Sequence, residues 1–597
     1  MAARSNCAVQ ASTTGSQRSR ACAVTAAAAP SSSIWLAVSP SSVSWVLSAV
    51  SGQGVEVSPV VLTVPDPVEV PAEYRRPEDG RSIFRPHLDE RYATLGQLQA
   101  EERIVTGARQ VTAPAMTAAE PVGLCEELVA AGLGPDQVDA VAGIVGSGRA
   151  GDVPIGPAGT GKSYTVGALA QVWGERFGGR VLGLAPSQIA AQVLADDGVP
   201  ALNTAAFLVR FTPDEQGNVR ERVRPGDLYV IDEAGMSSTA DLDRIAAIVR
   251  DGGGKIVFTG DQHQLASVGS GGVLALLAAD NGAHELAEVH RFRHDWEREA
   301  SLRLRAGDTS VITAYEDRGR LRGGTREQMQ AAALRGYLAD TLAERESLLI
   351  VGTNADAAAL SREIRERLID YGRVSAERVA ELGPLAGGSE VGVGDVVQAR
   401  RVDRSIRVEG GPHVANRATY TVLGRGPDGT LRVRGTAGEI ADLPGAYVAH
   451  HLTLAHASTV HAAQGRAVDT SHAVLDEGAA REAAYVALTR GRESNIAYLT
   501  ATRDPDEHDV ERLDSTAAGR LASVLGNVEA RHAAEVERRI GVREGASLAW
   551  VGGQWDEVAR DAARDRLHRR AARRPRPGRA RRAHHRARVA AVAARGA

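Results

Sequence analysis

The feature that most constrains this chain is a glycine-rich segment that ends in a lysine and a serine, Gly156-Pro-Ala-Gly-Thr-Gly161-Lys162-Ser163. Among its 70 basic residues the chain has only two lysines, Lys162 and Lys255. Given the glycine content of the chain, the probability that either of the two lysines would have glycine at both positions of the phosphate-loop pattern by chance is only about 2%. Such a loop wraps backbone N–H groups around phosphate and joins a strand to a helix. An α/β domain that binds phosphate is therefore predicted.

Each residue type in this loop has a predicted part in holding a nucleotide. Lys162 is expected to neutralise the β- and γ-phosphates, and the Ser163 hydroxyl is placed for Mg²⁺. A helix over 164–173 would present its N-terminus to the phosphates. ATP and Mg²⁺ are the predicted cofactors, and the nucleotide contacts are assigned to Gly156, Pro157, Ala158, Gly159, Thr160, Gly161, Lys162 and Ser163.

The strand that leads into the loop has an unfavourable sequence. It reads Gly151-Asp-Val-Pro-Ile155, and Pro154 cannot donate a hydrogen bond to a ladder. We therefore expect a shortened or distorted strand at this position.

Two later apolar runs are predicted to deliver polar side chains to the same edge of a parallel sheet. The run 228–231 is followed by Asp232 and Glu233. Asp232 is expected to hold Mg²⁺ through water, and Glu233 to activate the water that attacks the γ-phosphate. The alternative is that these carboxylates form an ordinary acidic strand end without a function. This alternative is weak here, because the two residues follow a phosphate loop by about 70 residues. The run 255–259 leads to Gln264, which is expected to sense the γ-phosphate.

Composition excludes several classes of protein. Hydrophobic residues make up 43% and charged residues 24% of the 597 residues, which is typical of a globular chain. No run of eighteen uninterrupted apolar residues occurs, so no membrane segment is expected. Cys7, Cys22 and Cys125 lie too far apart in sequence for a zinc site or a disulfide framework. A reducing, cytoplasmic location is therefore expected.

The net charge of −4 hides a strong asymmetry along the chain. Residues 566–597 contain twelve arginines and no acidic residue, and residues 56–565 carry a net charge of −19. Binding of nucleic acid by overall charge is therefore disfavoured. Any nucleic acid must be held by local sites.

The order of segments predicts an α/β protein with irregular ends. Apolar β-type runs at 181–184, 228–231, 255–259, 347–352 and 495–500 alternate with helical segments. We expect residues 1–60 to be low-complexity and disordered, and residues 61–120 to form a linker and one helical hairpin with a helix over 95–108. A first α/β domain is expected at 121–310, and a second at 311–500 with a small antiparallel barrel inserted at 384–450. Residues 501–565 are expected to be helical, and residues 566–597 to form a disordered arginine-rich tail.

Further polar residues follow in a fixed order between residues 133 and 500. They are Gln137, Ser187 in Ala185-Pro-Ser187-Gln, Arg291 in Glu288-Val-His-Arg291, Thr459, His461 and Gln464 in Thr459-Val-His461-Ala-Ala-Gln464-Gly, and Arg490 in Tyr485-Val-Ala-Leu-Thr-Arg490. Together with the glycine-rich loop, the acidic strand end at Asp232 and Glu233 and the strand end that carries Gln264, this order of motifs resembles the RecD-like branch of superfamily 1 DNA helicases. Within that branch it is most similar to the helicase half of conjugative relaxases of the TraA/MobF type.

The resemblance implies a fold and a role for each of these residues. Two RecA-like domains would hold ATP between them. Gln137 would read the adenine ring, and Arg291 and the arginine finger Arg490 would contact the γ-phosphate. Ser187 would touch single-stranded DNA, and the motif with Thr459, His461 and Gln464 would bind DNA and couple it to the nucleotide.

The implied function is ATP-driven translocation along single-stranded DNA, 5′ to 3′, with unwinding at a duplex junction, in plasmid conjugation and with conjugation-machinery proteins as partners. The alternative is a truncated relaxase remnant that binds DNA or ATP without productive unwinding. A phosphoryl-transfer kinase has little support, because residues 455–492 would then have no role. The nicking half of such relaxases needs a tyrosine and three histidines near the start, whereas the first of each here are Tyr74 and His87. No DNA nicking is therefore expected.

Overall fold

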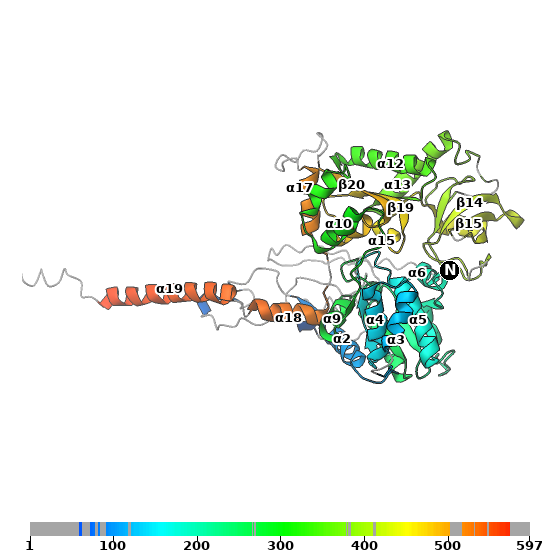
Figure 1. Ribbon diagram of the computed structural model, residues 1–597. Coiled ribbons are helices and arrows are strands. Elements are labelled where there is room, and N and C mark those ends of the chain that lie inside the picture. The colour runs from blue at the N-terminus through cyan, green and yellow to red at the C-terminus, as the bar shows by residue number, and fades with distance from the viewer. Residues whose placement is uncertain are drawn as a thin grey trace, which may run out of the picture.

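The computed structural model shows two α/β domains, one above the other in Figure 1, with the long helix α19 (Leu548–Arg573) projecting to one side. This confirms the predicted α/β class. The structure describes residues 59–62, 72–77, 82–83, 91–117, 121–265, 267, 270–377, 379, 384–409, 413–436, 438–501, 516–529, 532–545 and 548–573. The predicted low-complexity segment lies outside these residues except for 59 and 60.

The first domain is built on a parallel five-stranded sheet. Alternate residues of β7 face opposite sides: Leu228 and Val230 pack with α3, α4 and α5, whereas Tyr229 and Ile231 pack with α7, α8 and α9. Both faces are therefore covered, as in other parallel sheets. The strand order is β3 (Gly151–Asp152), β8 (Lys255–Phe258), β7 (Leu228–Ile231), β5 (Val181–Ala185) and β6 (Ala201–Asn203). The helices are α3 (Pro121–Ala130), α4 (Pro135–Gly146), α5 (Lys162–Phe177), α6 (Gln188–Asp196), α7 (Thr204–Phe211), α8 (Thr239–Asp251) and α9 (Val273–Asn281), with the short η2 (Ala234–Met236).

The strand before the glycine-rich loop is broken, as Pro154 predicts. Its first half, β3, pairs with β8, whereas its second half, β4 (Pro154–Ile155), pairs with β9 (His284–Glu285). A bridge from Ile155 to Gly260 keeps the end of β4 next to the sheet. The loop is therefore still placed at the carboxyl edge of the first sheet.

The second domain also has a parallel five-stranded sheet. Helices α12 and α13 cover one face, and α10, α11, α16 and α17 cover the other. Helix α10 lies within the range predicted for the first domain, yet its residues Ala300 and Leu304 belong to this second core. The strand order is β10 (Leu321–Gly324), β20 (Gly491–Thr500), β19 (Val468–Leu475), β11 (Ser347–Val351) and β18 (Ala457–Thr459). The helices are α10 (Asp295–Ala306), α11 (Val311–Glu316), α12 (Arg326–Leu342), α13 (Asn354–Asp370), α15 (Val460–Ala463), α16 (Arg481–Ala487) and α17 (Ala517–Gly526).

The segment predicted as an inserted barrel forms a six-stranded antiparallel sheet around its own apolar core. The expected turn is present as η3 (Pro427–Gly429), where Asp428 has a φ of 55°. The strand order is β13 (Val408–Glu409), β16 (Ile440–Leu443), β15 (Leu431–Gly435), β14 (Thr419–Arg425), β12 (Val396–Ala399) and β17 (Leu452–Leu454), and α14 (Gly445–His451) precedes β17.

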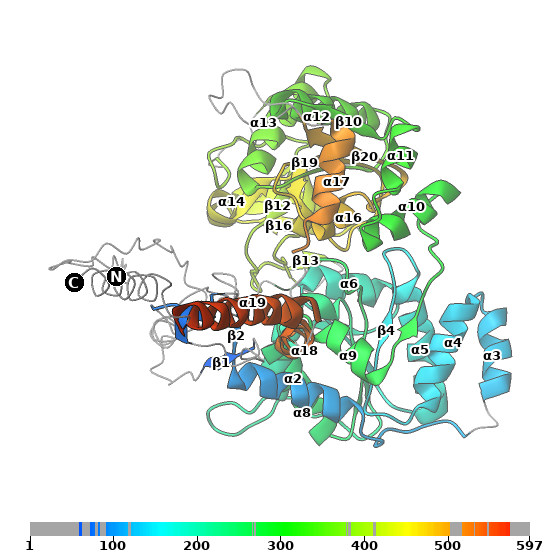
Figure 2. The ribbon, with the colours of Figure 1, turned by 90° about the vertical axis from the view of Figure 1, so that its left-hand side faces the viewer.

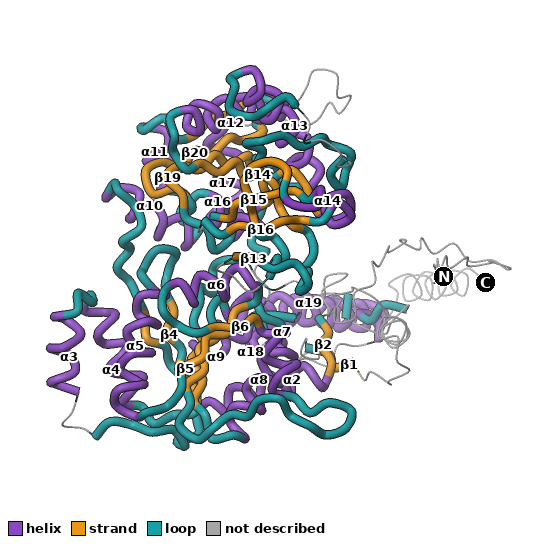
Figure 3. Tube along the Cα trace, turned by 90° about the vertical axis from the view of Figure 1, so that its right-hand side faces the viewer, coloured by secondary structure: helices purple, strands orange, loops and turns teal. Residues whose placement is uncertain are grey.

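The lead-in helix α2 (Leu95–Ala108) and the C-terminal helix α18 (Ala534–Gly545) lie side by side (Figures 2 and 3). The fully buried Glu101 carboxylate accepts hydrogen bonds from the N–H groups of Ala534 and Glu535, each at 2.9 Å. It therefore caps the N-terminal end of α18. Near α2 lie the paired strands β1 (Pro59–Val61) and β2 (Tyr92–Thr94), and η1 is Ala72–Tyr74.

The two ends of the predicted organisation compare differently with the structure. Of the expected helical hairpin, α2 is the helix that lies among the described residues before Pro121, and the rest of residues 61–120 is only partly described, so the hairpin remains a prediction. Helix α19 continues to Arg573, eight residues into the segment predicted to be a disordered tail. Alanine and arginine are both good helix formers, which accounts for this extension. Residues 574–597 lie outside the described part.

Candidate nucleotide site

The glycine-rich loop has the backbone that its glycines predict. Gly159 and Gly161 adopt φ values of 88° and 74°, which disfavour any residue with a side chain. A Cβ atom at Gly159 would lie 2.5 Å from the Cβ of Arg291, so glycine is also required by this close approach. The N–H of His290 donates to the Gly159 carbonyl at 2.8 Å. The segment that carries Arg291 therefore packs directly on the loop.

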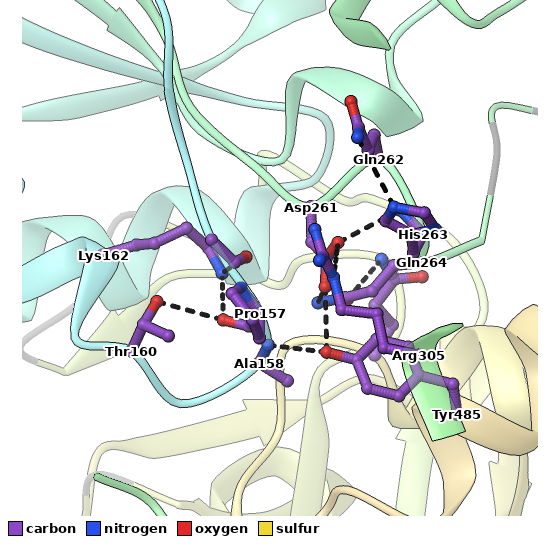
Figure 4. Close-up of polar contacts among 12 residues, drawn as sticks. Pro157, Ala158, Thr160, Lys162, Asp261, Gln262, His263, Gln264, Arg305 and Tyr485 are labelled. Atoms are coloured by element: carbon purple, nitrogen blue, oxygen red, sulfur yellow. Dashed lines mark hydrogen bonds and ion pairs between the residues drawn. The ribbon is translucent and has the colours of Figure 1, made fainter. Parts of the chain in front are cut away.

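Lys162 lies at the start of α5 and folds back onto the loop (Figure 4). Its Nζ donates to the carbonyl oxygens of Gly156 and Pro157, each at 2.9 Å. Burial lowers the pKa of Lys162, and the negative charges of Glu233 and the nearby aspartates oppose this shift. The ammonium is thus held at the loop and faces acidic groups.

Asp232 and Glu233 follow β7 at the carboxyl edge of the sheet, as the sequence predicts. Burial, followed by the charge of Glu233, raises the pKa of Asp232 to about 7. Glu233 has a φ of 48° and a ψ of 44°, a conformation that is strained for a residue with a side chain and is typical of functional sites. Two acidic groups therefore meet here, close enough to Lys162 for their charges to act on it.

A pair of carboxylates next to a phosphate loop suits a divalent cation. Within the described residues, no group of three or more His, Cys, Asp and Glu side chains forms a metal site. Mg²⁺, however, is usually bound by one or two protein groups together with phosphates and waters. Asp232, and the Ser163 hydroxyl in the first turn of α5, remain the predicted ligands of such an ion.

A buried cluster around Asp261 joins the two domains at the loop (Figure 4). The Tyr485 hydroxyl donates to Oδ2 of Asp261 at 2.9 Å and accepts from the Ala158 N–H at 2.8 Å. Arg305 of α10 forms an ion pair with Oδ1 of Asp261 at 3.0 Å. Burial and the Asp261 charge raise the pKa of Tyr485, so its hydroxyl remains protonated. The loop, β8, α10 and α16 are therefore connected by one tyrosine and one aspartate.

Sequence reasoning did not select Asp261, Tyr485 or Arg305 as site residues. One signal was available, because Asp261 follows the apolar run 255–259 in the way that Asp232 follows 228–231. The contribution of Tyr485 depends on how the two domains pack, which one sequence does not reveal.

A second contact between the domains joins two residues that the sequence did select. Nε2 of Gln464 lies 3.3 Å from Oε1 of Gln264, and Nε2 of Gln264 lies 3.5 Å from Oδ2 of Asp261. Gln264 is 5% exposed, and Oε1 of Gln464 is buried without a hydrogen-bond partner. Gln464 of the second domain therefore lies next to the group assigned to γ-phosphate sensing.

Arg291 and Arg490 are brought together from the two domains. Nη1 of Arg291 donates to the Thr489 carbonyl at 2.7 Å, and Nε of Arg490 donates to the Val486 carbonyl at 2.8 Å. Burial, with the neighbouring Arg490 charge, lowers the pKa of Arg291 to about 9. Burial also lowers the pKa of Arg490, against the charge of Glu233. Two buried guanidinium groups therefore face the acidic end of the site.

Gln137 supports the loop through both ends of its amide. Nε2 donates to the Thr160 carbonyl at 3.0 Å, and Oε1 accepts from the Gly134 N–H at the start of α4. Its side chain is 4% exposed. The adenine contact implied by the resemblance remains a prediction.

The other residues assigned to DNA lie at the start of α6 and at the start of α15, two helices at the facing edges of the two domains (Figure 1). Ser187 caps α6 by accepting from the Ala190 N–H at 3.1 Å. Thr459 is the N-cap of α15, and burial lowers the pKa of His461, so this imidazole is neutral at pH 7. These groups can act through hydrogen bonds and packing more than through charge.

None of the described helices combines the length and the apolar character needed to cross a membrane.

A family model described as an AAA domain matches residues 132–326. The conjugal transfer protein TraA of Rhizobium radiobacter is 26% identical over 361 residues, which is 59% of this chain and 31% of that protein. The probable conjugal transfer protein TraA of Sinorhizobium fredii is 28% identical over 250 residues, 41% of this chain and 22% of that protein. The chain thus spans a third or less of the length of these relatives.

Among solved structures, the Pif1 helicase from Candida albicans has a TM-score of 0.41 at 15% identity, covering 62% of this chain and 94% of that chain. Bacteroides Pif1 bound to ssDNA has a TM-score of 0.40 at 18% identity, covering 61% of this chain and 92% of that chain. The resemblance to conjugative TraA proteins is therefore confirmed by sequence similarity, and the phosphate loop lies within a segment that matches the AAA domain family.

Proposed function

We propose that this chain is an ATP-driven motor that moves 5′ to 3′ along single-stranded DNA and unwinds duplex DNA during plasmid conjugation. The observation that carries the proposal is the contact of both domains with one phosphate loop, through Tyr485, Ala158 and Asp261. A phosphoryl-transfer kinase would leave residues 455–492, which include Tyr485, without a role. Hydrolysis that alters the contact would change the distance between two DNA-binding edges.

The chemistry of the proposed site follows from its charges. Lys162, Arg291 and Arg490 would stabilise the negative charge that develops on the transferred phosphoryl group. Glu233 would accept a proton from the attacking water, giving ADP and phosphate. Ser163 and Asp232 would hold Mg²⁺, which would neutralise charge on the phosphate oxygens.

Coupling to DNA would pass through Gln264 and Gln464, which touch across the domain boundary. Gln464 lies one residue beyond α15, the short helix that carries His461. A change at the γ-phosphate would therefore reach residues assigned to DNA through one hydrogen bond. Ser187 on α6 would hold the strand at the opposite edge. The TraA names of the sequence relatives support a role in conjugation.

Steady-state ATP hydrolysis, with and without single-stranded DNA, tests the proposal. We expect DNA to stimulate hydrolysis by the wild-type protein. Lys162→Ala should abolish hydrolysis, and Glu233→Gln should retain nucleotide affinity while losing the chemical step by roughly a hundredfold or more. Arg362→Ala, on the exposed side of α13, is the control and should behave as wild type.

Unwinding of duplexes with either a 5′ or a 3′ single-stranded overhang tests the direction. Unwinding from the 5′ overhang alone supports the proposed polarity. Nucleotide binding without hydrolysis or unwinding would contradict the motor and would favour a remnant that only binds ATP or DNA.

A further inference from the structure

An open recess of about 510 Å³ lies in the second domain, away from the phosphate loop. One side is α12, and the floor is formed by β19 and β20, which Figure 1 shows beneath that helix. The strand β10 and residues 293–294 complete the rim. This volume is within the range of sites that bind a nucleotide-sized ligand.

Five arginines line this recess, which we call the arginine recess: Arg293, Arg320, Arg322, Arg335 and Arg345. Two acidic residues, Asp340 and Glu493, also line it. The lining therefore has an excess of three positive charges, without counting its two histidines. This excess lies within a segment, 56–565, whose net charge is −19.

The acidic residues of the recess do not neutralise all of its arginines. Arg345 pairs with Asp340 at 3.1 Å, and Arg293 pairs with Glu493 at 2.7 Å. Arg322 and Arg335 are exposed, and neither pairs with a carboxylate among the described residues. The Arg322 guanidinium lies 5.8 Å from the centre of the Tyr498 ring. Two guanidinium groups are therefore available to an anion.

The floor of the arginine recess is fixed by a buried hydrogen-bond network. Nε2 of His472 lies 3.0 Å from Asp340, and Nδ1 of His472 lies 3.0 Å from the Tyr498 hydroxyl. Gly336 of α12 permits this packing, because a Cβ there would lie 2.5 Å from the His472 ring. A rigid floor with exposed cationic groups at the rim suits recognition of a charged ligand.

We propose that the arginine recess binds phosphate groups, those of a single-stranded DNA backbone, outside the edges formed by α6 and α15. Guanidinium groups match phosphate oxygens in geometry and charge and remain charged at neutral pH. Within the acidic segment 56–565, this local excess of positive charge could attract a phosphate backbone that the net charge of the segment would repel. The inference rests on the charge and shape of the second domain, and not on hydrolysis at the loop.

Binding of a labelled oligothymidylate without nucleotide tests the proposal, by fluorescence anisotropy at several salt concentrations. The double variant Arg322→Glu/Arg335→Glu should bind about tenfold more weakly, with the salt slope reduced by about 1.4, because each lost contact with single-stranded DNA removes about 0.7. The control Arg362→Glu/Arg367→Glu makes the same charge change on the exposed side of α13 and should stay near wild type. Hydrolysis in the absence of DNA should be unchanged in both variants, which separates this test from that of the motor.

A second arm distinguishes free phosphate compounds from DNA. Thermal stabilisation by ADP is measured in the Lys162→Ala background, with and without the two arginine substitutions. If the two arginine substitutions remove the stabilisation by ADP but leave DNA binding unchanged, the recess binds the phosphates of a free nucleotide and not those of DNA. DNA affinity and ADP stabilisation equal to those of the control would overturn the proposal. Arg335→Ala is the folding control, because a melting temperature equal to that of wild type shows that the arginine can be replaced without unfolding the protein.

Discussion

At the scale of single residues, the second lysine is as informative as the first. Lys255 is fully buried, and its Nζ lies 2.6 Å from Oδ2 of Asp152. It also donates to the Ser147 hydroxyl at 3.0 Å and to the Arg149 carbonyl at 2.7 Å. Three partners surround one ammonium group, which the planar fork of an arginine would not match. In a chain that otherwise uses arginine, this geometry explains the lysine.

Lys255→Met should destabilise the protein by about 3–5 kcal/mol, because the Asp152 carboxylate would remain buried without a cation. Urea unfolding measures the change. Arg103→Met removes an exposed ion pair with Asp243 and should cost less than about 1 kcal/mol. Lys255→Met/Asp152→Asn should recover much of the loss. An equal, small effect of both single changes would contradict the assignment of a buried ion pair.

The raised pKa of Asp232 predicts a pH dependence of metal binding. Because its pKa in the folded protein, about 7, lies above the ordinary value of 3.8, the folded state retains a proton that the unfolded state releases. Stability from this group therefore falls as pH rises from about 4 to about 7. Mg²⁺ needs the ionised carboxylate, so it should restore more stability above this range than below it.

Melting temperatures with ADP, with and without Mg²⁺, at about pH 6 and about pH 8 test this. The gain due to Mg²⁺ should be larger at the higher pH, and Asp232→Asn should remove the difference. An equal gain at both pH values in the wild type would place the metal away from Asp232.

At the scale of elements, strands with mainly apolar sequences were predictable, whereas a strand in which half of the residues are polar was missed. The strand 228–231 was predicted with its observed bounds, and the break caused by Pro154 was also expected. The central strand β19 was missed, because it reads Val468-Asp-Thr-Ser-His-Ala-Val-Leu. Its polar groups are satisfied by distant partners: the Ser471 hydroxyl donates to the Ala487 carbonyl at 3.0 Å. A pattern of hydrophobicity cannot reveal such partners.

The candidate site shows the same division between local and distant information. The loop and the acidic strand end are continuous in sequence, so they could be located there. The site also needs Asp261, Arg305 and Tyr485, which lie on β8's carboxyl end, α10 and α16. Tyr485 is 224 residues from Asp261, and their contact depends on the packing of two domains.

At the scale of the whole molecule, the two domains are joined close to the phosphate loop by few polar groups. Tyr485→Phe would leave the Ala158 N–H and one Asp261 oxygen without this partner. We expect the stimulation of hydrolysis by DNA to fall about tenfold, with nucleotide affinity nearly unchanged, because the tyrosine joins the two domains and is not one of the groups assigned to the phosphates.

Separate measurements of kcat and of KM for ATP, with and without DNA, test this role of Tyr485. Tyr371→Phe, at the exposed end of α13, is the matched control. A rise in KM with unchanged stimulation would instead make Tyr485 a nucleotide-binding residue.

The capping of α18 by Glu101 has a consequence for how the chain matures during translation. The carboxylate and the N–H of Ala534 are 433 residues apart. At about 5–20 residues per second, the ribosome needs roughly 20–90 seconds to make the chain between them. Until then Glu101 lacks the helix end that it caps in the finished fold. The first domain therefore completes its core, to which Ala533 belongs, only after nearly all of the described chain has been synthesised.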